Sequence, residues 1–275
     1  MASAETFQRG KVRPAAVAGR FYPADPAELR DLINVLLAQA PPATGPAPKA
    51  LIAPHAGYLY SGPIAASAYA QLIPGRDQIR RVVLLGPSHY VPLDGLATSS
   101  AEAFATPLGL VPLDLEVIRR AQSLPQVTQM DEAHAQEHSL EVHLPFLQTV
   151  LGEFTLVPLA VGGASAEGIA EVLEALWGGP ETRFVISSDL SHYHDLQSAG
   201  RLDRATAKAI EALKPAGIGE ERACGRSSIR GLLQVARQHG LRARTIDLRT
   251  SGDTAGPRDQ VVGYGAFVFD EAPAR

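Results

Sequence analysis

The chain has 275 residues, of which 45% are hydrophobic and 20% charged, so it can bury a substantial core and lacks a disordered composition. Its formal net charge of −4 gives no general attraction to nucleic acid or to an anionic membrane. The single cysteine excludes an intrachain disulfide, and zinc-finger spacings are absent. Because residues 1–10 have no signal-peptide core and no apolar run approaches the roughly 20 residues that span a bilayer, the expected location is the cytoplasm.

Residues 1–12 are expected to form a flexible arm, followed by a single domain over residues 13–270. Apolar residues at helical spacing follow N-cap residues, and short apolar runs ended by Pro, Gly or Ser are typical of buried strands. In chain order these signals predict a helix from Pro26, strand 50–53, a helix near 63–72, strand 82–85, a helix from Asp114 to Ala121, strand 154–161, a helix capped by Ser165, strand 184–187, helices near 198–213 and 226–239, and strands 242–248 and 261–269. Residues 91–112 look irregular.

This alternation of strands and helices predicts an α/β fold with a mostly parallel or mixed sheet flanked by helices. The last two strands are joined by the Gly/Pro-rich loop 251–259, and they are expected to be antiparallel. No repeat of fixed period and no low-complexity linker divides the chain, which again favours one domain.

Three of the predicted strands lead into side chains that bind metals. Strand 50–53 is followed by His55, strand 82–85 by His89, and strand 184–187 by Asp189 and His192. Ligands of an open α/β sheet sit outside the carboxyl ends of its strands, so these residues are expected to converge. Imidazole suits zinc, iron and copper, and carboxylate suits iron and manganese. The sequence therefore predicts a metal site at this edge.

Cys224 lies between Arg222 and Arg226, and Gly225 follows it near a predicted helix start. Positive charge and a helix N-terminus both favour a thiolate, which is a nucleophile or a soft metal ligand. The alternative is an inert buried thiol, which is common for a lone cysteine.

A second histidine pattern competes with this site. His134, Glu137 and His138 fit H-x-x-E-H, in which two histidines on a helix bind zinc and the glutamate acts as base. The pattern would make the protein a zinc hydrolase, but the polar residues around His134 are typical of an exposed loop. A role in substrate hydrogen bonding fits the dense group from Glu137 to His143 better.

Several motifs in chain order carry a family resemblance. They are Arg13-Pro14 with Ala18 to Pro23, Ala53 to Tyr58 with Tyr60 to Gly62, Leu85 to His89, Glu137 to Phe146, Ser187 to Tyr193, Cys224-Gly225, Thr250 to Asp253, and Val262 to Tyr264. Together they resemble the Memo family, also called AmmeMemoRadiSam system protein B, over nearly the whole chain.

The resemblance implies a fold similar to that of the LigB-type class III extradiol dioxygenases, which hold a non-haem Fe(II) with two histidines and a glutamate. Carried over to this chain, it implies His55, His89 and Cys224 as metal ligands, with the cysteine in place of the glutamate. Asp189 and His192 match the acid/base pair beside the metal. Fe(II) is the expected cofactor, and Cu or Zn are alternatives because a thiolate is a softer ligand than a carboxylate.

The resemblance also places His138, His143, Tyr58 and Ser88 around the ligands or the substrate. It implies an oxidoreductase similar to a dioxygenase, acting on an unknown small molecule or peptide, and a radical-SAM protein as partner. A non-catalytic module that binds a peptide or phosphopeptide is an alternative, as is the zinc-dependent hydrolase. No nucleic-acid or membrane partner is expected.

Overall fold

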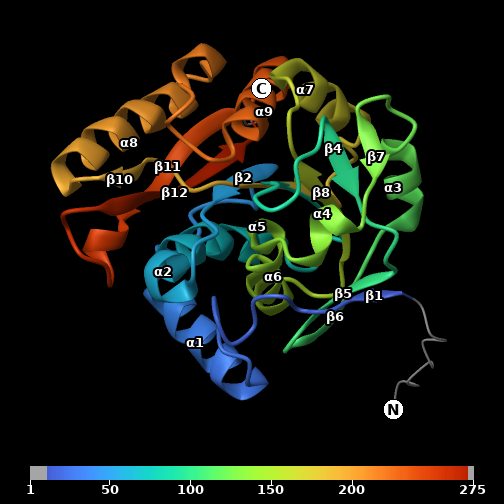
Figure 1. The fold of residues 1–275 in the computed structure, drawn as a ribbon, viewed down its shortest axis with the longest axis horizontal. Coiled ribbons are helices and arrows are strands. Elements are labelled where there is room, and N and C mark those ends of the chain that lie inside the picture. The colour runs from blue at the N-terminus through green and yellow to red at the C-terminus, as the bar shows by residue number, and fades with distance from the viewer. Residues whose placement is uncertain (1–10, 272–275) are drawn as a thin grey trace.

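The computed structural model describes residues 11–271 and has the predicted α/β architecture, with a mixed sheet between two layers of helices (Figure 1). Residues 1–10 of the predicted arm lie outside the described residues. Val12 belongs to a short strand, β1 (Val12–Arg13), which pairs with β5 (Ala103–Thr106), and β6 (Gly109–Pro112) completes this small sheet. No helix in the described part of the chain is both long and apolar enough to cross a membrane.

The main sheet has the strand order β10-β12-β2-β9-β3-β8-β4-β7, with β11 paired to β12. Its strands are β2 (Ala50–Ala53), β3 (Arg81–Pro87), β4 (Leu96–Thr98), β7 (Val127–Gln129), β8 (Thr155–Val161), β9 (Thr182–Ser187), β10 (His192–His194), β11 (Arg242–Thr250) and β12 (Val261–Asp270). The central strands β2, β9, β3 and β8 are parallel, and their buried apolar runs need cover on both faces. The predicted antiparallel pairing of the last two strands is confirmed.

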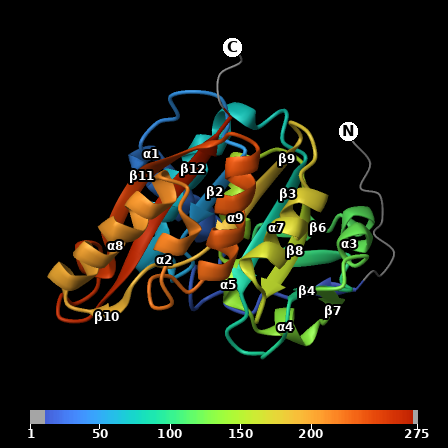
Figure 2. The ribbon, with the colours of Figure 1, turned by 90° about the horizontal axis from the view of Figure 1, so that it is seen from above.

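Helices cover both faces of this sheet (Figures 1 and 2). One layer contains α1 (Pro26–Gln39), α2 (Tyr58–Tyr69), α5 (His138–Glu141) and α6 (Leu144–Val150), and the other contains α7 (Ala166–Ala175), α8 (Leu196–Glu211) and α9 (Arg226–Gln238). The shorter helices are α3 (Leu115–Ala121), α4 (Glu132–Ala135), η1 (Ala70–Gly75), η2 (Pro215–Gly217) and η3 (Ser251–Asp253). The predicted caps are confirmed: Asp25, Asp114 and Ser165 each accept a hydrogen bond from the first turn of their helix.

The structure corrects two sequence predictions about elements. Residues 91–112 are irregular only in part, because they include β4, β5 and β6, which are three or four residues long and too short for a clear periodic signal. The helix predicted near 63–72 begins earlier, at Tyr58. Pro63 lies inside this helix, and the amides of Tyr60 and Ser61 already bond to Gly57 O at 2.8 and 3.0 Å.

The register of the central strands brings their carboxyl ends to one edge. Ala53 pairs with Ser187, and Leu85 pairs with Ile186 on the other side of β9. The loops that follow β2, β9 and β3 therefore leave the sheet side by side. This edge is where an open α/β sheet places its ligands.

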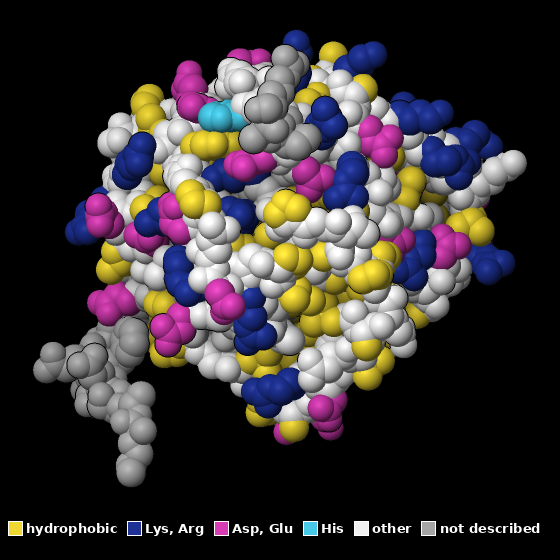
Figure 3. All heavy atoms as spheres, turned by 180° about the vertical axis from the view of Figure 1, so that it is seen from behind, with side chains coloured by type: hydrophobic (Ala, Val, Ile, Leu, Met, Phe, Trp, Pro, Cys, Tyr) yellow, Lys and Arg dark blue, Asp and Glu magenta, His cyan; other side chains and the backbone are white. Residues whose placement is uncertain are grey.

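A cavity lies at the opposite edge of the sheet, at the amino ends of β3 and β8. It measures about 720 Å³, and its lining includes Arg81, Phe154 and Thr155 but no histidine or cysteine. Viewed from behind, the molecule also shows hydrophobic side chains gathered in a hollow (Figure 3). The cavity at this opposite edge therefore lacks the imidazole and thiol ligands expected for the metal site.

Candidate metal centre

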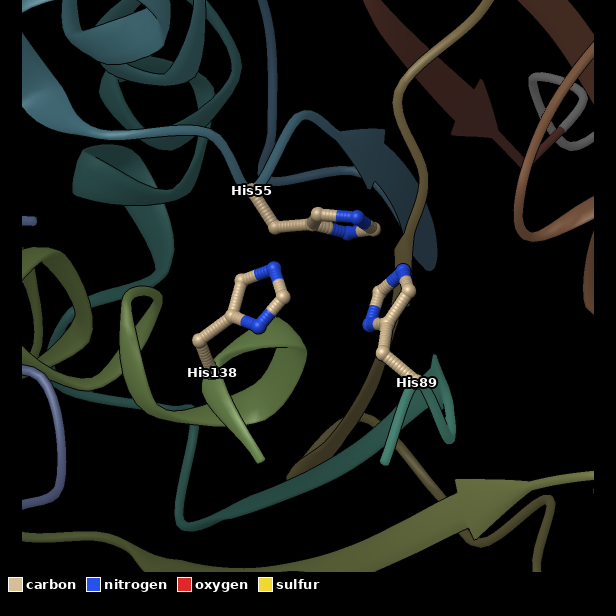
Figure 4. A group of neighbouring side chains, drawn as sticks. All are labelled: His55, His89 and His138. Atoms are coloured by element: carbon tan, nitrogen blue, oxygen red, sulfur yellow. The ribbon is translucent and has the colours of Figure 1, made fainter. Parts of the chain in front are cut away.

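Three imidazoles converge at the carboxyl edge of the sheet. His55 and His89 each lie two residues beyond the end of their strand, and His138 is the first residue of α5. One ring nitrogen of each histidine lies within 4.8 Å of the others, and the three rings point toward one another (Figure 4). The predicted convergence of His55 and His89 is therefore present, and His138 joins them at the position of a third ligand.

Hydrogen bonds to the strand ends hold α5 in this place. Ser139 Oγ donates to Pro87 O at 2.7 Å, and Ser187 Oγ donates to Ser139 O at 2.6 Å. The backbone at Gly86 is so close that a Cβ there would lie 2.7 Å from Ser139 Oγ. These contacts tie the helix to β3 and β9, which explains how a residue more than 45 positions from His89 reaches the same point.

The ring orientations leave metal-binding nitrogens free. His89 Nδ1 lies 2.9 Å from Glu137 Oε1, and His55 Nδ1 lies 2.6 Å from Ser187 Oγ. Because the Ser187 hydroxyl donates elsewhere, it accepts from His55, so Nδ1 carries the proton and Nε2 is bare. Such partners behind a histidine orient it and raise its basicity as a ligand. His138 Nδ1 is buried 3.3 Å from Glu137 Oε1 but is not aligned for a hydrogen bond.

The protonation states also suit a metal. Burial, together with the imidazoles of His89 and His138, lowers the pKa of His55 well below its ordinary value, so the ring is neutral. Burial opposes ionisation of Glu137, but hydrogen bonds from His89 and Ser139 outweigh it and lower the pKa of Glu137 to about 2. The site thus combines the neutral His55 imidazole with one ionised carboxylate, and deprotonated groups of this kind are what metal binding requires.

Cys224 adjoins this group without belonging to the compact set of three. Its Sγ lies 3.4 Å from His55 Nε2 and accepts a hydrogen bond from the Asp189 amide at 3.2 Å. The expectation that flanking arginines favour a thiolate is wrong, because Arg222 and Arg226 donate to Leu202 O and Glu220 O. Burial and the charge of Asp189 raise the pKa of Cys224 to about 12. A cation at the site would be needed to produce the thiolate.

Asp189 lies directly beside the three imidazoles. Its Oδ1 accepts from the His55 amide at 2.8 Å, and its Oδ2 is 4.0 Å from His55 Nε2. Burial raises the pKa of Asp189 above its ordinary value. His192, its predicted partner, is half-buried in β10 with Nδ1 2.8 Å from Leu190 O, and the structure shows no hydrogen bond between the two side chains. The structure therefore places Asp189 against His55 and shows no direct pairing of Asp189 with His192.

The remaining predicted residues are held by protein contacts. His143 Nδ1 lies 2.8 Å from Tyr69 Oη, Tyr58 Oη donates to Val142 O at 2.6 Å, and Ser88 Oγ donates to Val91 O at 2.7 Å. These side chains support the loops and helices around the cluster, and none of them is in the compact set.

The zincin pattern is wrong in its geometry. His134 lies in α4, which ends at Ala135, whereas His138 opens α5. The two histidines therefore do not share a helical face, and His134 Nε2 donates to Ala97 O at 3.0 Å. Glu137, the base in that pattern, is instead the partner of His89. Sequence reasoning missed this role and that of Ser187, because neither residue carries a local signal for it.

An α/β fold that gathers three imidazoles and a half-buried thiol at the carboxyl edge of a mixed sheet defines a class of proteins with a candidate metal centre on strand ends. A family model described as "Memo-like protein" matches residues 13–268, and the chain belongs to the Memo family. This confirms the resemblance inferred from the motifs.

Curated relatives have the same extent. A MEMO1 family protein from Methanopyrus kandleri is 38% identical over 279 residues, covering 94% of this chain and 98% of that protein. MEMO1 family proteins from Aquifex aeolicus and Ignicoccus hospitalis are 34% and 35% identical, each over 94% of this chain. The similarity therefore spans every segment that builds the site.

Proposed function

We propose that this protein is a metal-dependent oxidoreductase that uses Fe(II), with copper or zinc as the competing metals. The ligands would come from His55, His89 and Cys224, with His138 as a further candidate. The observation that carries the proposal is the convergence of three imidazoles within 4.8 Å, with Cys224 Sγ 3.4 Å from His55 Nε2. A mixed set of imidazole and sulfur ligands suits iron, copper and zinc.

Fe(II) held in this way would supply redox chemistry with O₂, as in other non-haem iron sites. The residues around it would orient and move protons. Glu137 and Ser187 keep the His89 and His55 rings turned toward the centre. Asp189, with its raised pKa, would hold a proton near His55, and half-buried His192 would exchange protons at the rim. The proposed substrate is a small molecule or peptide, and the proposed partner is a radical-SAM protein, both from the family resemblance.

Metal content tests the centre directly. The protein would be purified anaerobically, loaded with Fe(II) and analysed for metal and for O₂ consumption, beside His55→Ala, His89→Ala, His138→Ala and Cys224→Ser. We expect His55→Ala, His89→Ala and Cys224→Ser to lose bound iron and O₂ consumption. His239→Ala is the matched control, because this exposed ring pairs with Glu174 outside the site. Equal metal in the control and in His55→Ala would refute the proposed centre.

The same series separates the candidate ligand sets. Loss of iron in His138→Ala with retention in Cys224→Ser would indicate a site of three histidines, because imidazole alone would then suffice. Loss in Cys224→Ser with retention in His138→Ala would indicate two histidines and the thiolate. Iron retained without O₂ consumption in the wild type would contradict the oxidoreductase activity and leave a metal-binding module.

A further inference from the structure

A small cavity lies next to the candidate metal centre. It measures about 80 Å³, the space of a few water molecules. The carboxyl ends of β3 and β8 form one side of it at Pro87 and Val161, and residues 224–228 at the start of α9 form the other. Cys224 lines this cavity and also lies 3.4 Å from His55 Nε2, so the cavity and the centre share one wall.

The start of α9 offers free hydrogen-bond donors to this space. Its N-cap is Gly225, which has no side chain to cap the helix. The amide of Gly225 is used by Ser188 Oγ, and the amide of Ile229 bonds to Gly225 O. Among the described residues the amides of Ser227 and Ser228 have no partner. The N-terminal end of this 13-residue helix also carries the positive end of its dipole.

A second observation points to a ligand. Ser228 is only 1% exposed, and its Oγ is buried without a hydrogen-bond partner among the described residues. Buried hydroxyl groups almost always have a partner, and because Ser228 lines the cavity, its free hydroxyl is available to a group bound there. Arg226 adds a guanidinium to the same lining, and within residues 11–271 its side chain makes a single hydrogen bond, to Glu220 O at 3.4 Å.

We propose that this cavity binds a compact oxyanion, the carboxylate or phosphate group of the substrate. Amide, hydroxyl and guanidinium donors and the helix dipole all favour an acceptor with negative charge, as in other anion sites at helix N-termini. This inference rests on the proposed function, because the group would hold the rest of the substrate against the centre on the other side of Cys224. The substrate class is therefore an anionic small molecule or a peptide bearing such a group.

Titration of the full-length protein with inorganic phosphate at constant ionic strength tests the site. Calorimetry would give the affinity, and NMR would follow the amides of Ser227 and Ser228. We expect Arg226→Gln to weaken phosphate binding at least about tenfold and Ser228→Ala about fivefold, from the loss of a charge-assisted and a neutral hydrogen bond. Arg237→Gln at the far end of α9 is the matched control and should bind as the wild type does. A parallel titration with acetate distinguishes a carboxylate site from a phosphate site.

The outcome is separable from that of the metal experiment. His55→Ala removes a proposed ligand of the centre but none of the donors of the cavity, so it should keep phosphate binding and the amide shifts. Binding lost in His55→Ala would place the anion on the metal and overturn the proposal. Equal affinity in wild type, Arg226→Gln and Ser228→Ala would overturn it as well. Ser228→Ala removes only an unpartnered hydroxyl, so a retained unfolding midpoint would show that its effect is local.

Discussion

At the scale of single residues, the histidines of this chain differ in which ring nitrogen is bonded to the protein. His55 and His89 each have Nδ1 bonded to an oxygen of a neighbouring side chain, which leaves Nε2 as the ring nitrogen available to a metal. His134 has the reverse arrangement: Nε2 donates to Ala97 O, and Nδ1 is buried without a partner. A ring of this kind stabilises the fold in its neutral state and has no nitrogen at the site.

The burial of His134 predicts a specific pH dependence of stability. Burial lowers the pKa of His134 to about 4 from 6.5, so the folded state resists protonation more than the unfolded state does. The stabilisation is complete above pH 6.5 and is lost as the pH falls toward 4, by up to roughly 3 kcal/mol. In urea unfolding between pH 8 and 4, His134→Gln should show a shallower loss of stability than the wild type. Parallel curves for the two proteins would contradict this assignment.

At the scale of elements, one carboxylate connects the segment from β1 to α1 with α5, the helix that begins at His138. Glu141 in α5 is fully buried and accepts hydrogen bonds from the side chain of Arg13, the amides of Ala16 and Val17, and Tyr22 Oη. Arg13 is also buried and donates to two backbone carbonyls in the 134–137 stretch. The N-terminal segment thereby supports the helix that carries His138.

Removing that carboxylate should be strongly destabilising. Glu141→Ala would leave the Arg13 guanidinium buried without its counter-charge and two amides without acceptors. Loss of one member of a buried ion pair costs about 3–5 kcal/mol, so the free energy of unfolding in urea should fall by that amount. The exposed Glu102→Ala serves as the control and should change it by less than about 0.5 kcal/mol. A similar small loss for both variants would show that Glu141 does not fasten the segment.

At the scale of the whole molecule, the candidate centre depends on the order of the strands. β2 and β3 are neighbours of β9, so the loops after them open beside one another, and α5 and the start of α9 lie over the same edge. The four segments that carry His55, His89, His138 and Cys224 thus lie next to one another at this edge. A metal bound there would crosslink all of them in the folded state only.

Metal binding should therefore raise the thermal stability of the protein. At a free metal concentration about 100 times the dissociation constant, the gain is about 2.7 kcal/mol. For a domain of this size, that gain corresponds to a rise in Tm of about 5–10 °C. Calorimetry of Fe(II)-loaded protein with and without a chelator measures the shift. His55→Ala should show no shift, and an equal shift in this variant would mean that the metal binds elsewhere.

Much of the fold was predictable from the sequence because its signals are local. Asp25, Asp114 and Ser165 marked helix starts, and the runs before His55 and His89 marked strands that end at the site. Short strands such as β4 escaped prediction because three residues carry too little periodicity, and they gain their stability from pairing with strands distant in sequence.

The sequence by itself determined which residue types stand at the strand ends, and with them the choice of this edge as the candidate metal site. Only the tertiary structure decided that His138 joins His55 and His89, that Glu137 orients His89, and that the thiol of Cys224 faces Asp189 rather than arginine. The physical reason is the separation along the chain over which each kind of interaction acts. Caps and periodicity act within one or two turns, whereas ring orientation and protonation depend on burial and on hydrogen bonds between segments that only the assembled sheet brings together.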